Sequence, residues 1–172
     1  AQVVLAVAAE LPQWFPVLPL ERIRGEVLVL RHAAFTECSA AMSSGGYLLP
    51  LGGDRALAGP TFYSADSPRR SGEWSIAEIR KNLQACVPIV AEAEIETIWS
   101  GVRTLLKHDR EPVVGAVPGA AGLFVFSAFA TKGLLQIPWL AQALSAVLQG
   151  QNNSIPNYFS SSRLAPDFWL RP

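Results

Sequence analysis

The sequence predicts an α+β fold with a mostly antiparallel sheet and helices on one side of it. Short apolar segments separated by Gly-rich turns fill residues 23–63 and indicate antiparallel strands. Apolar residues recur three and four positions apart after Ser75, and residues 134–148 form a second helix-like segment. Half of the 172 residues are apolar, which is enough for a sizeable core.

The composition argues against several classes of function. Acidic and basic residues balance at 14 each, so the chain lacks the basic field that steers proteins to nucleic acid. No apolar run is long enough to span a membrane. Cys38 and Cys86 are the only cysteines and lack the spacing of a metal site, so we expect unpaired thiols in a reducing, cytoplasmic compartment.

The N-terminal residues predict the first strand. Val3-Val-Leu-Ala-Val7 is a continuous apolar run, which is typical of a fully buried strand. The run is short and lacks the basic flank of a signal peptide. A chain that opens on such a strand is expected to be the C-terminal part of a longer polypeptide.

A meander of antiparallel strands is predicted next. Residues 23–30 alternate in polarity, and Tyr47-Leu-Leu-Pro50 is a short strand. Gly52-Gly-Asp-Arg55 is a hairpin turn, and residues 56–63 supply the partner strand. In the polar loop that follows, Arg69-Arg70 is interpreted as a charge pair or as a phosphate contact.

A capping box, Ser75-Ile-Ala-Glu78, predicts the start of the first long helix. Pro88 ends this helix. Its buried face is predicted to consist of Ile76, Ile79, Leu83 and Val87.

The acidic residues Glu92, Glu94 and Glu96 alternate with apolar ones and predict a strand with one solvated face. The alternative is a site for a hard cation, but the three carboxylates lack any other ligand nearby in the sequence.

The last strand and helix enclose the most informative turn of the chain. Residues 123–126 predict a buried strand, 127–133 a turn of small residues, and 134–148 a helix with Pro138 near its start and Gly150 after its end. Backbone N–H groups converge at such a turn, which suits an anion or an electron-rich cofactor edge. The tail, residues 151–172, is predicted to pack through its aromatic side chains.

Several of these segments together resemble a known family. They resemble the flavin-dependent amine and amino-acid oxidoreductases of the D-amino-acid oxidase type, of which glycine oxidase is representative. The matching segments, in family order, are Arg24-Gly-Glu-Val27, Gly46-Tyr-Leu-Leu-Pro50, Trp99-Ser-Gly-Val-Arg103, Asp109-Arg-Glu-Pro-Val-Val-Gly115, Gly122-Leu-Phe-Val125, Gly133 and Pro138. Within the family, residues 115–118 and 128–134 are most similar to the oxidase half of the bifunctional tRNA wobble-uridine (methylaminomethyl-thiouridine) modification enzyme.

The resemblance implies FAD as cofactor and hydride transfer from a small amine or amino-acid substrate. It matches Arg103 to an arginine that pairs with the substrate carboxylate, for which a guanidinium fork is suited. It matches Tyr47 to a tyrosine of the substrate pocket. It places Ala130, Thr131, Lys132 and Gly133 beside the flavin ring, where helix N–H groups and a lysine stabilise negative charge.

Each of these roles has a structural alternative. Arg103 and Tyr47 can be ordinary residues of the sheet, and Thr131 can merely cap the helix beside a solvated Lys132. His108 is expected to be a solvated loop residue. Because the family reaction needs no dedicated base, no catalytic residue and no metal ligand are assigned.

The chain departs from the family in lacking its nucleotide-binding fingerprint. Residues 1–10 are therefore predicted to be the last strand of a missing FAD-binding domain, 11–118 a substrate-binding domain, 119–150 a strand and helix that pack on the FAD domain, and 151–172 a tail. The expected partner is that missing half or a second copy of the chain, with no membrane; tRNA is a further candidate that the neutral charge does not support.

A second departure concerns the turn before the last helix. The family's glycines there are Ser127, Ala128 and Ala130 in this chain. This change favours an alternative function: a non-catalytic module derived from the same fold that binds a ligand or a partner.

Overall fold

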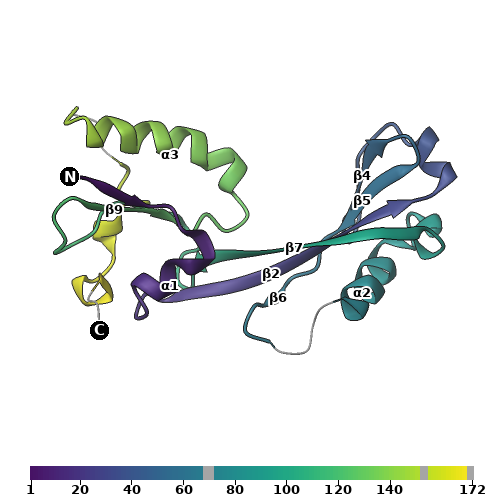
Figure 1. Ribbon diagram of the computed structural model, residues 1–172, viewed down its shortest axis with the longest axis horizontal. Helices are drawn as coiled ribbons and strands as arrows, with labels where there is room; N and C mark the ends of the chain where they lie inside the picture. Colours follow the sequence, from purple (N-terminus) through teal and green to yellow (C-terminus); the bar gives the residue numbers. More distant parts are fainter. Residues whose placement is uncertain (68–71, 152–154, 170–172) are drawn as a thin grey trace. The chain divides into compact units, whose positions relative to one another are not determined.

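The computed structural model describes residues 1–67, 72–151 and 155–169 (Figure 1). The chain divides into two compact units: the first unit comprises residues 1–22 and 103–172, and the second unit comprises residues 23–102. Strands β2 (Leu20–Arg31) and β7 (Glu94–Leu106) contribute residues to both. Arg69-Arg70 lies outside the described residues, so its predicted role is not tested.

The first unit is built on a three-stranded sheet in the order β1–β9–β8. β1 (Val3–Leu5) runs parallel to β9 (Leu123–Ser127), and β8 (Val113–Ala116) runs antiparallel to β9. Helix α3 (Gly133–Leu148) lies along this sheet (Figure 1). The predicted strand, turn and helix at residues 123–148 are confirmed, including Pro138 in the helix and Gly150 in a left-handed conformation after its end.

Both faces of this sheet carry buried side chains, because neighbouring residues of a strand point to opposite faces. One cluster joins α3 to the sheet and the tail through Val114, Phe124, Leu140, Leu144 and Phe159. The other cluster joins helix α1 (Leu11–Trp14) to the opposite face and the tail through Leu5, Leu11, Phe15, Leu18, Leu106, Val113, Val117, Val125, Ala128 and Trp169.

The tail is packed as predicted within the part described. It forms the short 3-10 helices η4 (Ser161–Arg163) and η5 (Pro166–Trp169). The ring of Trp169 meets that of Phe15 edge-on, with 5.1 Å between the ring centroids. Trp169 is only 4% exposed, so the tail completes a core cluster of the first unit.

The second unit contains a sheet in the order β3–β4–β5–β2–β6, with β7 also paired to β2. The strands on this path pair antiparallel. Its strands are β3 (Met42–Ser43), β4 (Tyr47–Gly52), β5 (Arg55–Gly59) and β6 (Tyr63–Ser64), in addition to β2 and β7. Its helices are α2 (Glu73–Leu83) and the 3-10 helices η2 (Ala33–Glu37) and η3 (Pro88–Ala91). A further 3-10 helix, η1 (Ala8–Glu10), belongs to the first unit.

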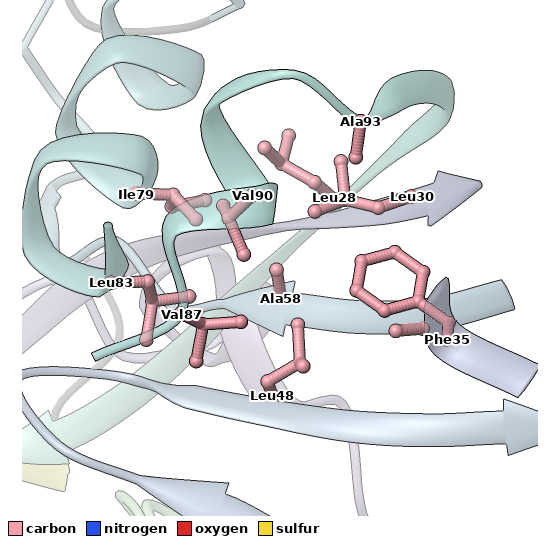
Figure 2. Close-up of a cluster of buried hydrophobic side chains, with 11 residues drawn as sticks. Leu28, Leu30, Phe35, Leu48, Ala58, Ile79, Leu83, Val87, Val90 and Ala93 are labelled. Carbon is pink, nitrogen blue, oxygen red and sulfur yellow. The ribbon is translucent and has the colours of Figure 1, made fainter. Parts of the chain in front are cut away.

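Figure 2 shows the core of the second unit, where α2 and η3 pack over the sheet. The core consists of Leu28, Leu30, Phe35, Leu48, Ala56, Ala58, Ile79, Leu83, Val87, Val90 and Ala93. The predicted α+β class, with a mostly antiparallel sheet, is confirmed.

The first strand is not buried as predicted. Val3 and Val4 are exposed and only Leu5 is buried. Among the described residues β1 pairs with β9 alone, so its other edge and most of its surface face outward. The apolar run identified a strand but did not show what covers it.

The capping box is also wrong. Helix α2 begins at Glu73, its N-cap is Gly72 at φ +59°, and no side chain caps it. Ser75 therefore lies buried inside the first turn. The helix ends at Leu83, so Val87 joins the core from beyond the helix rather than from its predicted face.

The hairpin at Gly52–Arg55 is confirmed, but its partner strand is shorter than predicted. β5 ends at Gly59, and residues 60–62 are not in a strand before β6. The break falls at Pro60, which has no N–H to donate to a neighbouring strand.

Candidate functional site

The β9–α3 turn, residues 128–132, joins the last strand of the first unit to its long helix. Ala128 and Ala130 adopt left-handed conformations, at φ +63° and +49°. Only glycine enters this region without a steric cost. The turn therefore keeps a backbone shape that favours glycine, although alanine occupies both positions.

Donor groups are exposed at the start of α3. Within the described residues, the backbone N–H groups of Thr131, Gly133 and Leu134 make no hydrogen bond to a backbone carbonyl. The first N–H groups of any helix lack partners inside it, and they lie at the positive end of the helix dipole. The β9–α3 turn therefore presents unpaired donors and partial positive charge at one end of the helix.

Lys132 is the N-cap residue of α3, and its side chain is part of an ion pair. Its Nζ lies 2.7 Å from Oε1 of Glu111. No side chain caps the helix, so neither alternative for this segment holds: Thr131 does not cap α3, and Lys132 is not simply solvated. The carboxylate of Glu111 instead holds the lysine at the turn.

The loop before β8 also anchors the tail. Arg163 donates from Nε to Asp109 Oδ2 at 3.0 Å and from Nη2 to the backbone carbonyl of Glu111 at 3.1 Å. Burial raises the pKa of the Asp109 carboxyl, but hydrogen bonds from Arg163 and from the N–H of Glu111 outweigh burial and leave the pKa below its ordinary value. The Asp109-Arg-Glu111 segment thus fixes two elements, the tail and the β9–α3 turn.

Arg103 lies in the part of β7 that belongs to the first unit, and its side chain is half-buried. The next residue, Thr104, accepts a hydrogen bond at its carbonyl from the N–H of Ala130, at 3.1 Å. The structure therefore brings the strand that carries Arg103 and the Ala130–Gly133 segment together, although 27 positions separate Arg103 from Ala130 in the sequence.

Tyr47, the other predicted substrate residue, belongs to the second unit. It begins β4, lies opposite Gly59 of β5 and is half-buried. It also lines a cavity of about 680 Å³, together with residues of β3 and of the β3–β4 turn, the segment 60–62 and helix α2. The prediction of a pocket at Tyr47 thus has a physical counterpart in this unit, while its contact with substrate stays a prediction.

The sequence analysis missed a buried polar network behind this cavity. Glu26 is 4% exposed; the Tyr63 hydroxyl donates to its Oε1 at 3.0 Å, and the N–H of Gly72 donates to its Oε2 at 3.3 Å. Burial and then the hydrogen bond to Glu26 raise the pKa of Tyr63. Thr61 Oγ1 accepts from the backbone N–H of Glu26. The only signal in the sequence was a glutamate directly before the apolar run at residues 27–30.

The acidic strand is used for ion pairing. Glu92, Glu94 and Glu96 are exposed, as predicted. Both carboxylate oxygens of Glu96 accept from Arg55, at 2.7 and 2.8 Å, and Oε2 also accepts from Arg31. The Arg55 hydrogen bonds are the main cause of the lowered pKa of Glu96. No group of three or more candidate metal ligands gathers in the part of the chain that the structure describes.

The remaining candidate residues are placed as expected. His108 is exposed, and Cys38 and Cys86 are free thiols. None of the helices in the described ranges is both long and apolar enough to cross a bilayer.

Comparison with known sequences gives one family over most of the chain. Residues 1–147 match the family described as FAD dependent oxidoreductase, DAO. The bifunctional tRNA 5-methylaminomethyl-2-thiouridine biosynthesis protein MnmC of Thiobacillus denitrificans is 28% identical over 144 residues, which cover 77% of this chain and 23% of that protein. Glycine oxidase of Geobacillus kaustophilus is 27% identical over 117 residues, which cover 67% of this chain and 31% of the oxidase.

Solved structures share the fold. The crystal structure of Geobacillus kaustophilus glycine oxidase superimposes with a TM-score of 0.81 at 24% identity, over 95% of this chain and 46% of the oxidase. Iminodiacetate oxidase from Chelativorans sp. BNC1 gives 0.77 at 21% identity, over 92% and 45%. The chain therefore spans less than half the length of these relatives, and the predicted resemblance to oxidases of the glycine oxidase type is confirmed.

Proposed function

Because this chain belongs to the FAD-dependent oxidoreductase (DAO) family, we propose that it is the C-terminal, substrate-binding portion of an enzyme that oxidises an amine or an amino acid. The family and its glycine oxidase members are FAD-dependent. When bound, FAD supplies the acceptor for the two electrons of the substrate. The proposal assigns this chain the binding and orientation of substrate and of one edge of the flavin.

One observation carries the proposal: the donor groups of the β9–α3 turn lie beside the strand that holds Arg103. The hydrogen bond from Ala130 to Thr104 joins the two segments. The unpaired N–H groups of Gly133 and Leu134 fit the electron-rich edge of a flavin, because they can donate to oxygen and nitrogen atoms that gain charge on reduction.

The ion pair of Lys132 and Glu111 has a defined role in this proposal. It keeps the ammonium group at the β9–α3 turn, where its remaining N–H groups can donate beside the positive end of the helix dipole while Glu111 balances its charge. Arg103 binds the carboxylate of an amino-acid substrate through two parallel hydrogen bonds. Tyr47, at the cavity of the second unit, is proposed as a substrate-binding residue through its hydroxyl. No residue of this chain is assigned as an acid or a base.

The substrate is a small free amine or amino acid. The two kinds of relative point in different directions: one is named glycine oxidase, and the other is named for the biosynthesis of a modified tRNA nucleoside. A tRNA substrate calls for a basic surface, and this chain has equal numbers of acidic and basic residues. The charge balance therefore favours the free amine.

Helix α3 and strand β1 contact the FAD-binding half in the proposed enzyme. Large apolar side chains are exposed on both elements, and Leu134 is 98% and Leu135 83% exposed. The others are Val3, Val4, Ile137 and Trp139. Exposed apolar side chains of this size on two elements of one unit are suited to an interface.

A non-catalytic module is the alternative function, and the structure gives it less support than the sequence did. It was favoured by the loss of glycines from the β9–α3 turn. Ala128 and Ala130 nevertheless adopt the left-handed conformations that glycine would adopt. The backbone shape of the turn is therefore present in this chain without the glycines.

Flavin retention tests the proposal. The chain alone, and the longer polypeptide that contains it, are each mixed with FAD, desalted and examined by visible absorption. We expect flavin bands only with the longer polypeptide. Bands with the chain alone would contradict the proposal that this is only a portion of the enzyme, and a colourless longer polypeptide would contradict the oxidoreductase function.

Substitution of Arg103 tests the substrate-binding role in the longer, flavin-loaded enzyme. Arg103→Leu should raise KM for an amino-acid substrate at least about tenfold, because a charge-assisted pair is lost. Arg103→Lys should restore part of the loss. Arg110→Leu, which changes an exposed arginine of the adjacent loop, is the matched control, and an unchanged KM for Arg103→Leu would contradict the role.

A further inference from the structure

We propose that Arg163, in the tail, is a positioning residue for the proposed flavin site and that it acts on Lys132. The link between the two is the loop that carries Asp109 and Glu111. The inference rests on the proposed function and adds a residue to it, because Arg163 lies outside residues 1–147, which match the family. The tail thus has a role at the cofactor as well as in the core of the first unit.

The Arg163 guanidinium binds the loop before β8 at two places. Its Nε and Nη2 donate to the two carboxylate oxygens of Asp109, at 3.0 and 3.4 Å. Nη2 also donates to the backbone carbonyl of Glu111 at 3.1 Å, and Nη1 donates to the carbonyl of Ser160 at 3.1 Å. The Arg163 side chain is only 15% exposed, so these hydrogen bonds are largely shielded from water and join the tail firmly to the loop.

The loop itself has a defined shape between these contacts. The N–H of Glu111 donates to Oδ1 of Asp109 at 2.9 Å. Arg110, between them, is in the left-handed region at φ +57°, and its N–H donates to the carbonyl of Leu106. A left-handed conformation costs energy for a residue other than glycine, so the loop keeps this shape through the contacts on either side. Arg163 supplies contacts to both flanking residues.

Glu111 connects the loop to the β9–α3 turn. Its backbone carbonyl accepts from Arg163, and its Oε1 accepts from Lys132 Nζ at 2.7 Å. The Glu111 side chain is 25% exposed and that of Lys132 is 46% exposed. Such a pair orders two long side chains at a cost in conformational entropy. The cost is smaller when one partner is already fixed, and Arg163 fixes the backbone of Glu111.

Lys132 is placed where its position matters to a flavin. It is the N-cap residue of α3, so it lies at the positive end of the helix dipole, next to the N–H groups of Gly133 and Leu134. When bound, the flavin edge gains negative charge on reduction, and donors held at this turn stabilise the reduced form more than the oxidised form. A mobile lysine stabilises it less. Arg163 therefore raises the reduction potential of the flavin through Lys132.

The reduction potential of the flavin in the longer polypeptide tests this role. Arg163→Lys keeps the positive charge but removes the guanidinium fork that binds Asp109 and Glu111 together. It should lower the ratio of reduced to oxidised flavin about threefold at a fixed ambient potential, which is a fall of about 15 mV for a two-electron couple. Arg110→Lys, in an exposed arginine of the same loop, is the matched control. An unchanged potential in Arg163→Lys would overturn the proposal.

A double-mutant cycle separates positioning of Lys132 from a purely structural role of the tail. Lys132→Met should lower the same ratio about tenfold, a fall of about 30 mV. If Arg163 acts through Lys132, Arg163→Lys should lower the potential no further in the Lys132→Met background. Equal effects of Arg163→Lys in the two backgrounds would overturn the proposal, because the tail would then reach the flavin by another route, such as the stability of the first unit.

A measurement without flavin keeps this inference distinct from the proposed function. Relaxation of ¹³C at the lysine Cε atoms reports side-chain motion in the labelled chain. Lys132 should be more restricted than Lys81 and Lys107, which are both exposed, and Arg163→Gln should release it to their level. Equal mobility of the three lysines in the unaltered chain, or no release in Arg163→Gln, would overturn this inference and leave the proposed function standing. A colourless longer polypeptide would instead contradict the proposed function, and the role of Arg163 at the flavin with it.

Discussion

The core of the second unit and helix α3 of the first unit use apolar residues in opposite ways. In the second unit, the apolar side chains of α2 and the sheet enclose one another, and Leu28, Leu30 and Leu48 are completely buried (Figure 2). On α3, Leu140 and Leu144 are buried, but Leu134 and Leu135 are almost fully exposed. The second unit thus completes its own core. Helix α3, in contrast, carries apolar side chains that the core of the first unit leaves exposed.

The contrast teaches that an apolar pattern identifies an element without showing how much of it this chain covers. Strand β1 shows the same: its apolar run predicted a strand, but its valines are exposed. The cost of removing a side chain from each region measures the difference directly, since an apolar side chain stabilises the fold mainly through the surface it buries.

The largest effect is expected in the core of the second unit. Leu48→Ala removes a completely buried side chain and should lower the free energy of unfolding by about 3 kcal/mol, from lost burial and the cavity left behind. Leu135→Ala on α3 is the matched control and should change it by less than about 0.5 kcal/mol. Urea unfolding of the two variants measures both values.

A loss of 2 kcal/mol or more in Leu135→Ala would break the comparison, because it would mean that α3 is covered in the isolated chain, for example by a second copy. The expected consequence of Leu135→Ala lies elsewhere: in the longer polypeptide it should weaken the proposed contact with the FAD-binding half and reduce flavin retention.

A second test concerns the close packing of the first unit on its tail. Gly115 of β8 has φ +125°, and a Cβ there would lie 3.1 Å from Ser161 Oγ. Gly115→Ala should therefore destabilise the chain by about 1–3 kcal/mol, since a non-glycine residue is strained in this conformation. Circular dichroism during thermal unfolding measures the change.

The matched control is Gly101→Ala in β7, where a Cβ would have no atom within 4 Å and φ is not in the left-handed range. This substitution should be neutral or slightly stabilising. If both substitutions lower the stability of the chain equally, the close approach at Gly115 does not contribute to stability. The tail would then not be a fixed part of the first unit.

The difference between the two regions also explains which features the sequence could predict. The hairpin at Gly52–Arg55, the strand 123–126 and the helix 134–148 were predicted because local signals define them: glycines, an apolar run, and Pro138 and Gly150 at the helix ends. The start of α2 was misplaced because Ser75 and Glu78 form a plausible capping box. The N-cap is instead Gly72, whose positive φ cannot be recognised from a sequence motif.

Long-range features were beyond local signals. Glu26 meets Tyr63 across 37 positions, and Tyr47 shares a cavity with Trp74 and Glu78. Neither spacing has a fixed meaning in sequence, because the sheet order β4–β5–β2–β6 and the packing of α2 on that sheet bring these residues together. The Arg103 and Ala130 segments were associated only through the family resemblance, and the Thr104 hydrogen bond gives that association its geometry.

A smaller effect of opposite sign is expected at the β9–α3 turn. Ala128→Gly and Ala130→Gly should each raise the free energy of unfolding by up to about 1 kcal/mol, because relief of left-handed strain exceeds the added flexibility of glycine in the unfolded chain. Ala141→Gly, in the exposed part of α3, should instead lower it by about 1 kcal/mol. Urea unfolding of all three variants gives the signs, and destabilisation by all three would contradict the left-handed conformations.

The smallest effect concerns the pH dependence of the Asp109–Arg163 pair. The pKa of Asp109 is lowered in the folded chain, so the pair contributes stability above the unfolded value, about 3.9, and this contribution is lost as the pH falls through the lowered folded value. Asp109→Asn should therefore cost stability at pH 7, by less than about 1 kcal/mol because the carboxyl is 40% exposed and screened by solvent.

The difference between unaltered chain and Asp109→Asn should shrink below about pH 4, where the carboxylate becomes protonated in both folded and unfolded chains. Urea midpoints at pH 7 and pH 3 measure it. Asp54→Asn is the matched control in the second unit, because Asp54 faces Arg31 at 3.9 Å with both side chains nearly half-exposed, and it should have the smaller effect. No cost of Asp109→Asn at pH 7 would mean that this pair adds nothing to the first unit, and that the other tail contacts, such as the burial of Trp169 against Phe15, hold the tail.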